Sequence, residues 1–176
     1  MSYMYEPLDD QVVPLPGVPQ PDRGAPLPTV LAGEHRLCLI YIVAESDPDW
    51  DGTYVTIATG NEPNEPYAVV LFLGPRCHYF GEPDHQDFAG HPLAPRGLKP
   101  HSVCEIASTS WIRALEDMNW DHDSGHSAKD FRGLRHFIFA FHDITFECLA
   151  AGFTVYRHRG TLGSALSLAG SKFALM

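Results

Sequence analysis

The chain has 176 residues, of which 44% are hydrophobic and 19% charged, a composition typical of an ordinary globular protein. Twelve basic residues stand against 22 acidic ones, which gives a formal net charge of −10. Because binding to nucleic acid and to anionic membranes depends on lysine and arginine, neither is an expected partner.

The cysteines and the N-terminus bear on the cellular compartment. Four cysteines are scattered without a C-x-x-C pair, so we expect free thiols and neither a zinc site nor a disulfide framework: Cys38, Cys77, Cys104 and Cys148. No charged segment followed by an apolar one opens the chain, and the longest apolar run, residues 37–44, is too short to cross a bilayer. These features predict a cytoplasmic protein, and the preference for arginine over lysine indicates a bacterial source.

Residues 1–34 differ in composition from the rest. Seven of the 15 prolines lie there: Pro7, Pro14, Pro16, Pro19, Pro21, Pro26 and Pro28. Repeated proline disfavours regular helix or sheet and favours an extended conformation. Two interpretations of the segment are therefore open, a loose leader or an ordered extended arm. The interspersed valines and leucines favour the arm. We expect residues 7–30 to dock on an apolar groove, preferably on a second copy, which predicts a homo-oligomer.

From His35 onward the pattern predicts short strands separated by turns, at residues 37–44, 53–59, 67–73, 77–80, 102–107, 134–150 and 153–158. Ser108 or Ser110 is expected to cap a helix whose apolar face carries Trp111, and a second short helix is expected over 127–133. Residues 81–101 hold four prolines and three glycines, which predicts a long loop.

These elements predict an α+β, β-rich fold for residues 35–176 as a single domain, with the arm of residues 1–34 attached. Five to seven strands with mostly short connections favour a largely antiparallel sheet, a sandwich or an open barrel, with one or two short helices. The three most apolar segments, 37–44, 67–73 and 136–149, are expected to be neighbouring central strands.

Residues 136–149 are the first candidate site. Treated as one strand, they place His142 on a mostly apolar face, while the opposite face changes from phenylalanine to Asp143 and Glu147. Carboxylates in a half-apolar setting tend to have raised pKa values and can transfer protons. The catalytic candidates are therefore His142, Asp143, Glu147 and, from the long loop, His91.

A purely structural interpretation of the same strand stays open. If Ala151-Gly152 closes a hairpin, Asp143 and Glu147 would belong to a solvated ladder of side chains shared with the following strand. The two carboxylates would also lie roughly 13 Å apart on a flat strand at about 3.3 Å per residue, too far to contact one atom. His142 would then be a buried histidine with a hydrogen-bond partner.

The histidines of the long loop are the second candidate site, for a divalent metal. They come with two carboxylates and one arginine: His78, His85, His91, His101, Asp84, Asp87 and Arg96. Zinc or iron needs two or three converging imidazoles, but neither H-x-H nor H-E-x-x-H spacing occurs, so solvated loop histidines remain the alternative. If a metal is bound, we expect its ligands among His91, His122 and His142; His122 lies in a polar turn with His126.

The chain lacks the common nucleotide and hydrolase motifs. Neither a Walker A nor a G-x-G-x-x-G pattern occurs, and no G-x-S-x-G sequence predicts a nucleophile on a strand–turn–helix. A triad of Ser110 or Ser124 with His142 is therefore not supported. The sequence predicts a small-ligand-binding protein, which could be an enzyme, with its site between the 136–149 strand and the 81–101 loop. The alternative is a non-catalytic protein-interaction module that oligomerises through its N-terminal arm.

Overall fold

The computed structural model describes residues 5–45, 58–120 and 131–174. These residues form nine strands: β1 (Gln11–Pro14), β2 (Thr29–Ala32), β3 (Leu37–Ile42), β4 (Glu65–Leu73), β5 (Cys77–Gly81), β6 (Ser102–Ala107), β7 (Arg135–Ala140), β8 (Thr145–Ala150) and β9 (Gly152–Gly160). They also form two α-helices, α1 (Ser110–Trp120) and α2 (Leu162–Phe173), and two 3₁₀ turns in the loop between β5 and β6, Phe88–Gly90 and Ala94–Arg96. The β-rich α+β class is confirmed.

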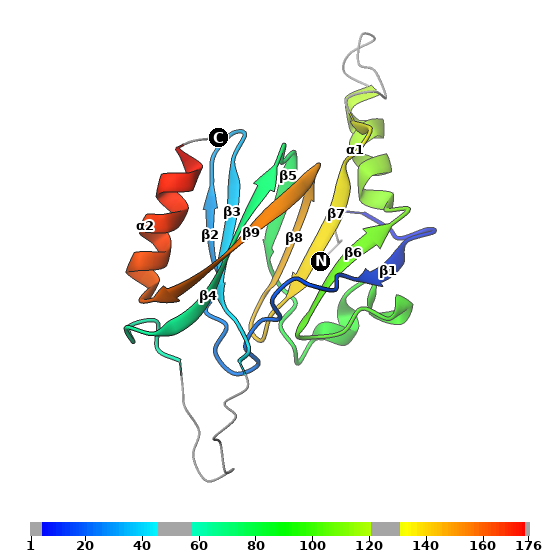
Figure 1. The fold of residues 1–176 in the computed structure, drawn as a ribbon. Coiled ribbons are helices and arrows are strands. Elements are labelled where there is room, and N and C mark those ends of the chain that lie inside the picture. The colour runs from blue at the N-terminus through cyan, green and yellow to red at the C-terminus, as the bar shows by residue number, and fades with distance from the viewer. Residues whose placement is uncertain (1–4, 46–57, 121–130, 175–176) are drawn as a thin grey trace.

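The strands make two antiparallel sheets packed face to face (Figure 1). The five-stranded sheet has the order β1-β6-β7-β8-β5, and the four-stranded sheet the order β2-β3-β4-β9. Aromatic side chains fill the space between them; Phe72 of β4, for example, stacks on Phe146 of β8 with ring centroids 5.4 Å apart. The protein is therefore a sandwich and not a closed barrel.

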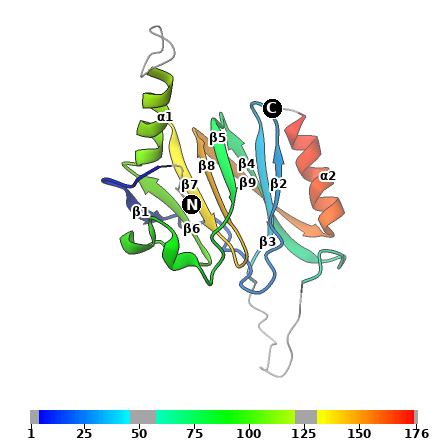
Figure 2. The same ribbon diagram turned by 180° about the vertical axis from the view of Figure 1, so that it is seen from behind.

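Each sheet is also covered on its outer face (Figure 2). Helix α2 packs on the four-stranded sheet through Ala165 and Ala169, whose small side chains allow close approach. The outer face of the five-stranded sheet is covered by three elements: α1 through Trp111, the N-terminal segment through Tyr5, and the β5–β6 loop through Leu93. Because polar side chains of this sheet lie under those three elements, they are removed from water.

The prediction that residues 136–149 form one central strand beside residues 37–44 and 67–73 is wrong. The segment is a hairpin of β7 and β8, and it belongs to the opposite sheet from β3 and β4. A turn over residues 141–144 is closed by the Phe141 N–H, which donates to the Ile144 carbonyl over 3.0 Å. Residues 37–44 and 67–73 are neighbours, as predicted.

The hairpin at Ala151-Gly152, on which the alternative interpretation of a solvated ladder depended, does not form, because β9 leaves β8 and pairs with β4 in the other sheet. The remaining strand predictions have mixed outcomes. Strands 77–80, 102–107 and 153–158 and the helix after Ser108 are confirmed. Residues 53–57 and 127–130 lie outside the described part of the chain, so the strand and the helix predicted there are not described.

The expectation that proline keeps residues 1–34 out of regular sheet is wrong in two places. Strand β1 pairs with β6 and β2 pairs with β3, each at the outer edge of its sheet. Proline is compatible with such an edge, because the missing N–H is not needed by a further strand. The strands of this segment thus pair in extended form with their own domain, and the preferred docking on a second copy stays a prediction. Neither of the two described α-helices is long and apolar enough to cross a lipid bilayer.

Candidate functional sites

Four polar side chains gather where the β7–β8 turn meets the long β5–β6 loop. The turn supplies His142 and Asp143, and the loop supplies His85 and His101; we call this group the turn site. One ligand atom from each of His85, His142 and Asp143 lies within 4.8 Å of the others. The loop is held to the turn by the His85 N–H, which donates to the His142 carbonyl over 2.9 Å.

Hydrogen bonds fix the orientation of two imidazoles in the turn site. Nδ1 of His85 lies 2.9 Å from the His142 carbonyl oxygen, and Nδ1 of His142 lies 2.5 Å from Oδ1 of Asp143. Both oxygens can only accept, so both Nδ1 atoms carry the proton when the rings are neutral. Each ring therefore keeps a lone pair on Nε2, the arrangement that metal-binding histidines adopt when Nδ1–H is bound to a carbonyl or carboxylate.

His101 is the third imidazole of the turn site. Its ring centroid lies 5.9 Å from that of His85 and 5.8 Å from that of His142, while His85 and His142 are 4.0 Å apart. Three rings on one tetrahedral metal would have centroids roughly 5 Å apart, given metal–nitrogen bonds of about 2.0 Å. Its Nδ1 is buried and has no hydrogen-bond partner among the described residues. Its backbone has φ of 56°, which costs energy for a residue other than glycine.

The protonation of the turn site favours a cationic ligand. Burial lowers the pKa of His101, and the nearby charges of His142 and His85 lower it further. The site remains open to water, since the side chains of His142 and Asp143 are 33% and 83% exposed. A metal bound there would have coordination positions facing solvent.

A second group lies on the outer face of the five-stranded sheet and is fully enclosed. Glu147 of β8 contacts His136 of β7 and His91 of the long loop, and Tyr5 of the N-terminal segment; we call this group the carboxylate cluster. Oε2 of Glu147 lies 2.8 Å from Nε2 of His136, and Oε1 lies 3.2 Å from Nε2 of His91. The Tyr5 hydroxyl donates to Oε2 over 3.4 Å. Both imidazoles and the carboxylate have no exposed surface.

The hydrogen-bond donors keep this carboxylate ionised. Burial alone would raise the pKa of Glu147, but hydrogen bonds from His136 and His91 outweigh it and lower the pKa to about 2. Nδ1 of His91 accepts the Leu93 N–H over 3.1 Å, so the proton of the neutral ring is on Nε2 and points at Glu147. Burial, and next the charge of Glu147, raise the pKa of Tyr5, which therefore stays a donor.

The carboxylate cluster continues to the start of α1. Nδ1 of His136 lies 2.9 Å from Oγ1 of Thr109. That oxygen accepts the Trp111 N–H over 3.2 Å, so its own proton is directed to His136. A chain of hydrogen bonds thus runs from Thr109 through His136 to Glu147 and His91.

The structure separates the four residues predicted as catalytic into two pairs. His142 and Asp143 belong to the turn site, whereas His91 and Glu147 belong to the carboxylate cluster. None of the described contacts joins the two groups, so a cavity shared by His142 with His91, His122 or Glu147 stays a prediction. His122 lies outside the described residues. Among the other loop residues, Arg96 binds the carbonyls of Pro7 and Leu8, and Asp84 accepts backbone N–H groups of the loop.

Sequence reasoning missed Tyr5 and Thr109, and it did not connect His136 with Glu147. On one continuous strand, those two residues would face opposite sides. The hairpin places Ile138 opposite Glu147, so that His136 and Glu147 share the outer face of the sheet. The polar pair His142-Asp143 inside an apolar run was the available signal for that turn.

Compared with protein-family models, curated proteins and solved structures, the chain has no significant match.

Proposed function

We propose that this protein binds a divalent transition metal at the turn site and, through that metal, a small ligand. The supporting observation is that ligand atoms of His85, His142 and Asp143 lie within 4.8 Å of one another. His101 is the proposed fourth ligand. Its strained backbone and its buried, unpartnered Nδ1 would be compensated by a bond to a metal.

The ligand types favour particular metals. Imidazole nitrogen suits zinc, iron, nickel and copper, whereas magnesium and calcium prefer sites made of oxygen. Three imidazoles and one carboxylate therefore favour Zn²⁺ or another first-row ion over Mg²⁺. The exposure of Asp143 and His142 leaves one side of the site accessible to a small molecule.

The proposal is tested by titration calorimetry with Zn²⁺ and, separately, Mg²⁺ on protein treated with a chelator and dialysed. We expect one Zn²⁺ per chain, no measurable Mg²⁺ binding, and about a 100-fold or greater loss of Zn²⁺ affinity in His142→Ala and in His101→Ala. His35→Ala is the matched control, because His35 is an exposed histidine whose Nε2 lies 3.7 Å from the carboxylate of Glu34. Equal losses in the control, or no stoichiometric Zn²⁺ binding, would contradict the proposal.

Oligomerisation through the N-terminal arm is the second candidate function. It is supported by three large apolar side chains of the arm that remain exposed, Leu8 (62%), Val13 (43%) and Leu27 (38%). Deleting the arm would also remove β1, β2 and Tyr5, so substitution is the cleaner test. If the arm joins two copies, Leu8→Ser combined with Val13→Ser should lower the mass measured by light scattering. An unchanged mass would argue against it.

A further inference from the structure

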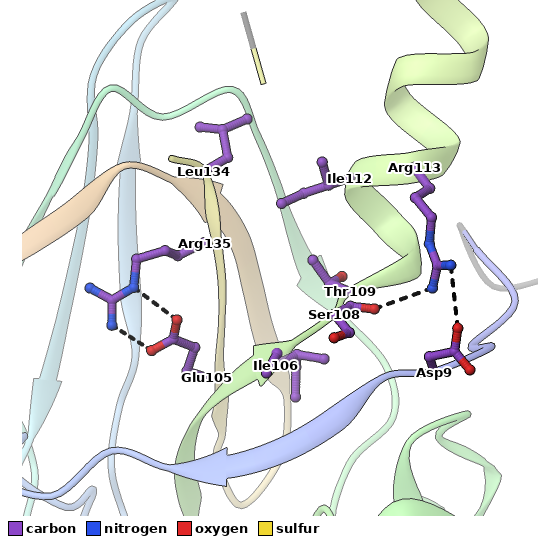
Figure 3. A pocket seen from close by; sticks show the side chains of 10 residues that line it. Asp9, Glu105, Ile106, Ser108, Thr109, Ile112, Arg113, Leu134 and Arg135 are labelled. Atoms are coloured by element: carbon purple, nitrogen blue, oxygen red, sulfur yellow. Dashed lines mark hydrogen bonds and ion pairs between the residues drawn. The ribbon is translucent and has the colours of Figure 1, made fainter. Parts of the chain in front are cut away.

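The hydrogen-bond chain of the carboxylate cluster ends beside a groove. The groove has a volume of about 490 Å³ and is lined by residues of β6, of β7 and of the start of α1, together with Asp9 (Figure 3). Its lining combines apolar side chains, such as Ile112 and Leu134, with the guanidinium of Arg113. This volume lies within the usual range for sites that hold a small molecule.

Thr109 is placed at this groove by a tight connection. Strand β6 ends at Ala107 and α1 begins at Ser110, so a strand, a two-residue turn and a helix follow one another. The turn is strained, because Ser108 has φ of 54°. Strand–turn–helix connections of this kind present nucleophiles in hydrolases, although the G-x-S-x-G sequence is absent here. Thr109 lines the groove and retains 7% of its surface.

The contacts of Thr109 match the roles of a nucleophile, a base and an orienting carboxylate. Its hydroxyl lies 2.9 Å from Nδ1 of His136, and Nε2 of the same ring lies 2.8 Å from Glu147. Because the carboxylate accepts from Nε2, the lone pair of the neutral ring is on Nδ1, toward the hydroxyl. A carboxylate in this position holds the imidazole in the required tautomer and stabilises the imidazolium that forms.

We propose that Thr109 is the nucleophile of a second site, which transfers the acyl group of a small ester to water. Thr109 and His136 are the catalytic residues and Glu147 is a positioning residue. This site is independent of the metal proposed at the turn site. The small exposed area of Thr109 restricts the substrate to short acyl groups.

The reaction balances with water as the only co-reactant. Oγ1 of Thr109 bonds to the ester carbonyl carbon while its proton moves to Nδ1 of His136. The tetrahedral intermediate breaks its bond to the alcohol oxygen, which takes that proton and leaves as the alcohol. Water then attacks the acyl-threonine with His136 again as the base, which releases the acid and restores the hydroxyl.

A purely structural role for Thr109 makes different predictions. Its hydroxyl oxygen also caps α1 by accepting the Trp111 N–H. Asparagine caps helices as well as threonine does, but its amide cannot form an acyl-enzyme. Thr109→Asn therefore keeps the cap and removes the nucleophile, while Thr109→Ser keeps both. Thr161→Asn is the matched control, because Thr161 caps α2 by accepting the Ser164 N–H and lies in neither site.

The test uses p-nitrophenyl acetate with the full chain, following p-nitrophenolate release and locating any acetyl group by peptide mass spectrometry. We expect an acetyl group on residue 109 in the unaltered protein, in Thr109→Ser and in Thr161→Asn, and none in Thr109→Asn. Glu147→Gln should slow acylation by about 10⁴-fold while the adduct still forms at residue 109. No acetylation of Thr109 in the folded protein, or equal p-nitrophenolate release by Thr109→Asn, would overturn the proposal.

Discussion

The turn site and the carboxylate cluster are made from the same kinds of side chain, yet their hydrogen bonding differs. In the carboxylate cluster, Glu147 accepts from His136, His91 and Tyr5 and is fully enclosed. In the turn site, the buried Nδ1 of His101 has no partner among the described residues, and the described hydrogen bonds of the His85 and His142 rings use Nδ1 and not Nε2. A buried group whose hydrogen bonds are all made stabilises the fold, whereas an unpaired one beside exposed side chains such as Asp143 is available to a ligand.

The largest difference between the two groups is expected in the free energy of unfolding, when the carboxylate of each is removed. We expect Glu147→Ala to lower the free energy of unfolding by about 3–5 kcal/mol, because it leaves His136 and His91 buried without their acceptor. Asp143→Ala should change it by less than about 0.5 kcal/mol, because Asp143 is 83% exposed. Urea denaturation measures both values. Equal losses would mean that the two groups do not differ as described.

Acid should weaken the carboxylate cluster in a defined pH range. The pKa of Glu147 is lowered to about 2 in the folded protein from an ordinary value of 4.5. A lowered pKa contributes stability that is complete above pH 4.5 and is lost as the pH falls toward 2. The contribution is on the order of 3 kcal/mol.

Urea denaturation between pH 6 and pH 2 measures this loss, with Glu147→Gln as the reference because glutamine does not titrate. The difference in stability between the two proteins should shrink as the pH falls. A difference that stays constant over this range would show that Glu147 does not titrate as described.

Zinc should stabilise the protein through the turn site alone. At a free concentration of 100 times Kd, a ligand that binds only the folded state adds about 2.7 kcal/mol. For a chain of this size that corresponds to a rise in Tm of roughly 5–11 °C. Differential scanning calorimetry with and without a chelator measures it. The rise should disappear in His142→Ala and persist in His35→Ala, and a rise that survives His142→Ala would place the metal elsewhere.

Within the carboxylate cluster, the smallest loss of stability is expected at its longest contact. Tyr5→Phe removes the hydroxyl that lies 3.4 Å from Glu147 but keeps the ring, which stacks on Trp111 with centroids 5.8 Å apart. Glu147 retains both imidazole donors, so we expect a loss of about 1 kcal/mol. A loss as large as that of Glu147→Ala in urea denaturation would show that the hydroxyl is essential to the cluster.

The sequence predicts those parts of the fold that depend on local patterns. Residues 37–44 and 67–73 are apolar runs of strand length, and they form β3 and β4 because both faces of that sheet are covered. The hairpin within residues 136–149 could not be predicted in the same way, because an apolar run with one polar pair fits either a single strand or a hairpin. Strands β1 and β2 were not predicted, because the prolines around them disfavour sheet. These strands form because they pair with β6 and β3, which the local sequence does not reveal.

The candidate sites show the same limit. His142 and Asp143 are recognisable because they interrupt an apolar segment, and His85 because it lies in a loop rich in histidine. Their convergence depends on how that loop docks on the β7–β8 turn, which involves residues 57 positions apart. Thr109 offers no signal in the sequence, since a threonine before a helix is usually only a cap.

The pairing of β1 with β6 has a consequence for synthesis on the ribosome. Gln11 pairs with Ala107, so β1 is made long before its partner exists. At roughly 5–20 residues per second, the N-terminal segment waits about 5–20 s for β6. A long apolar strand waiting that long would be exposed to pairing with other nascent chains, whereas β1 has only four residues and ends at Pro14, which has no N–H to donate. We therefore expect the seven prolines of the first 34 residues to limit pairing between nascent chains until β6 has been made.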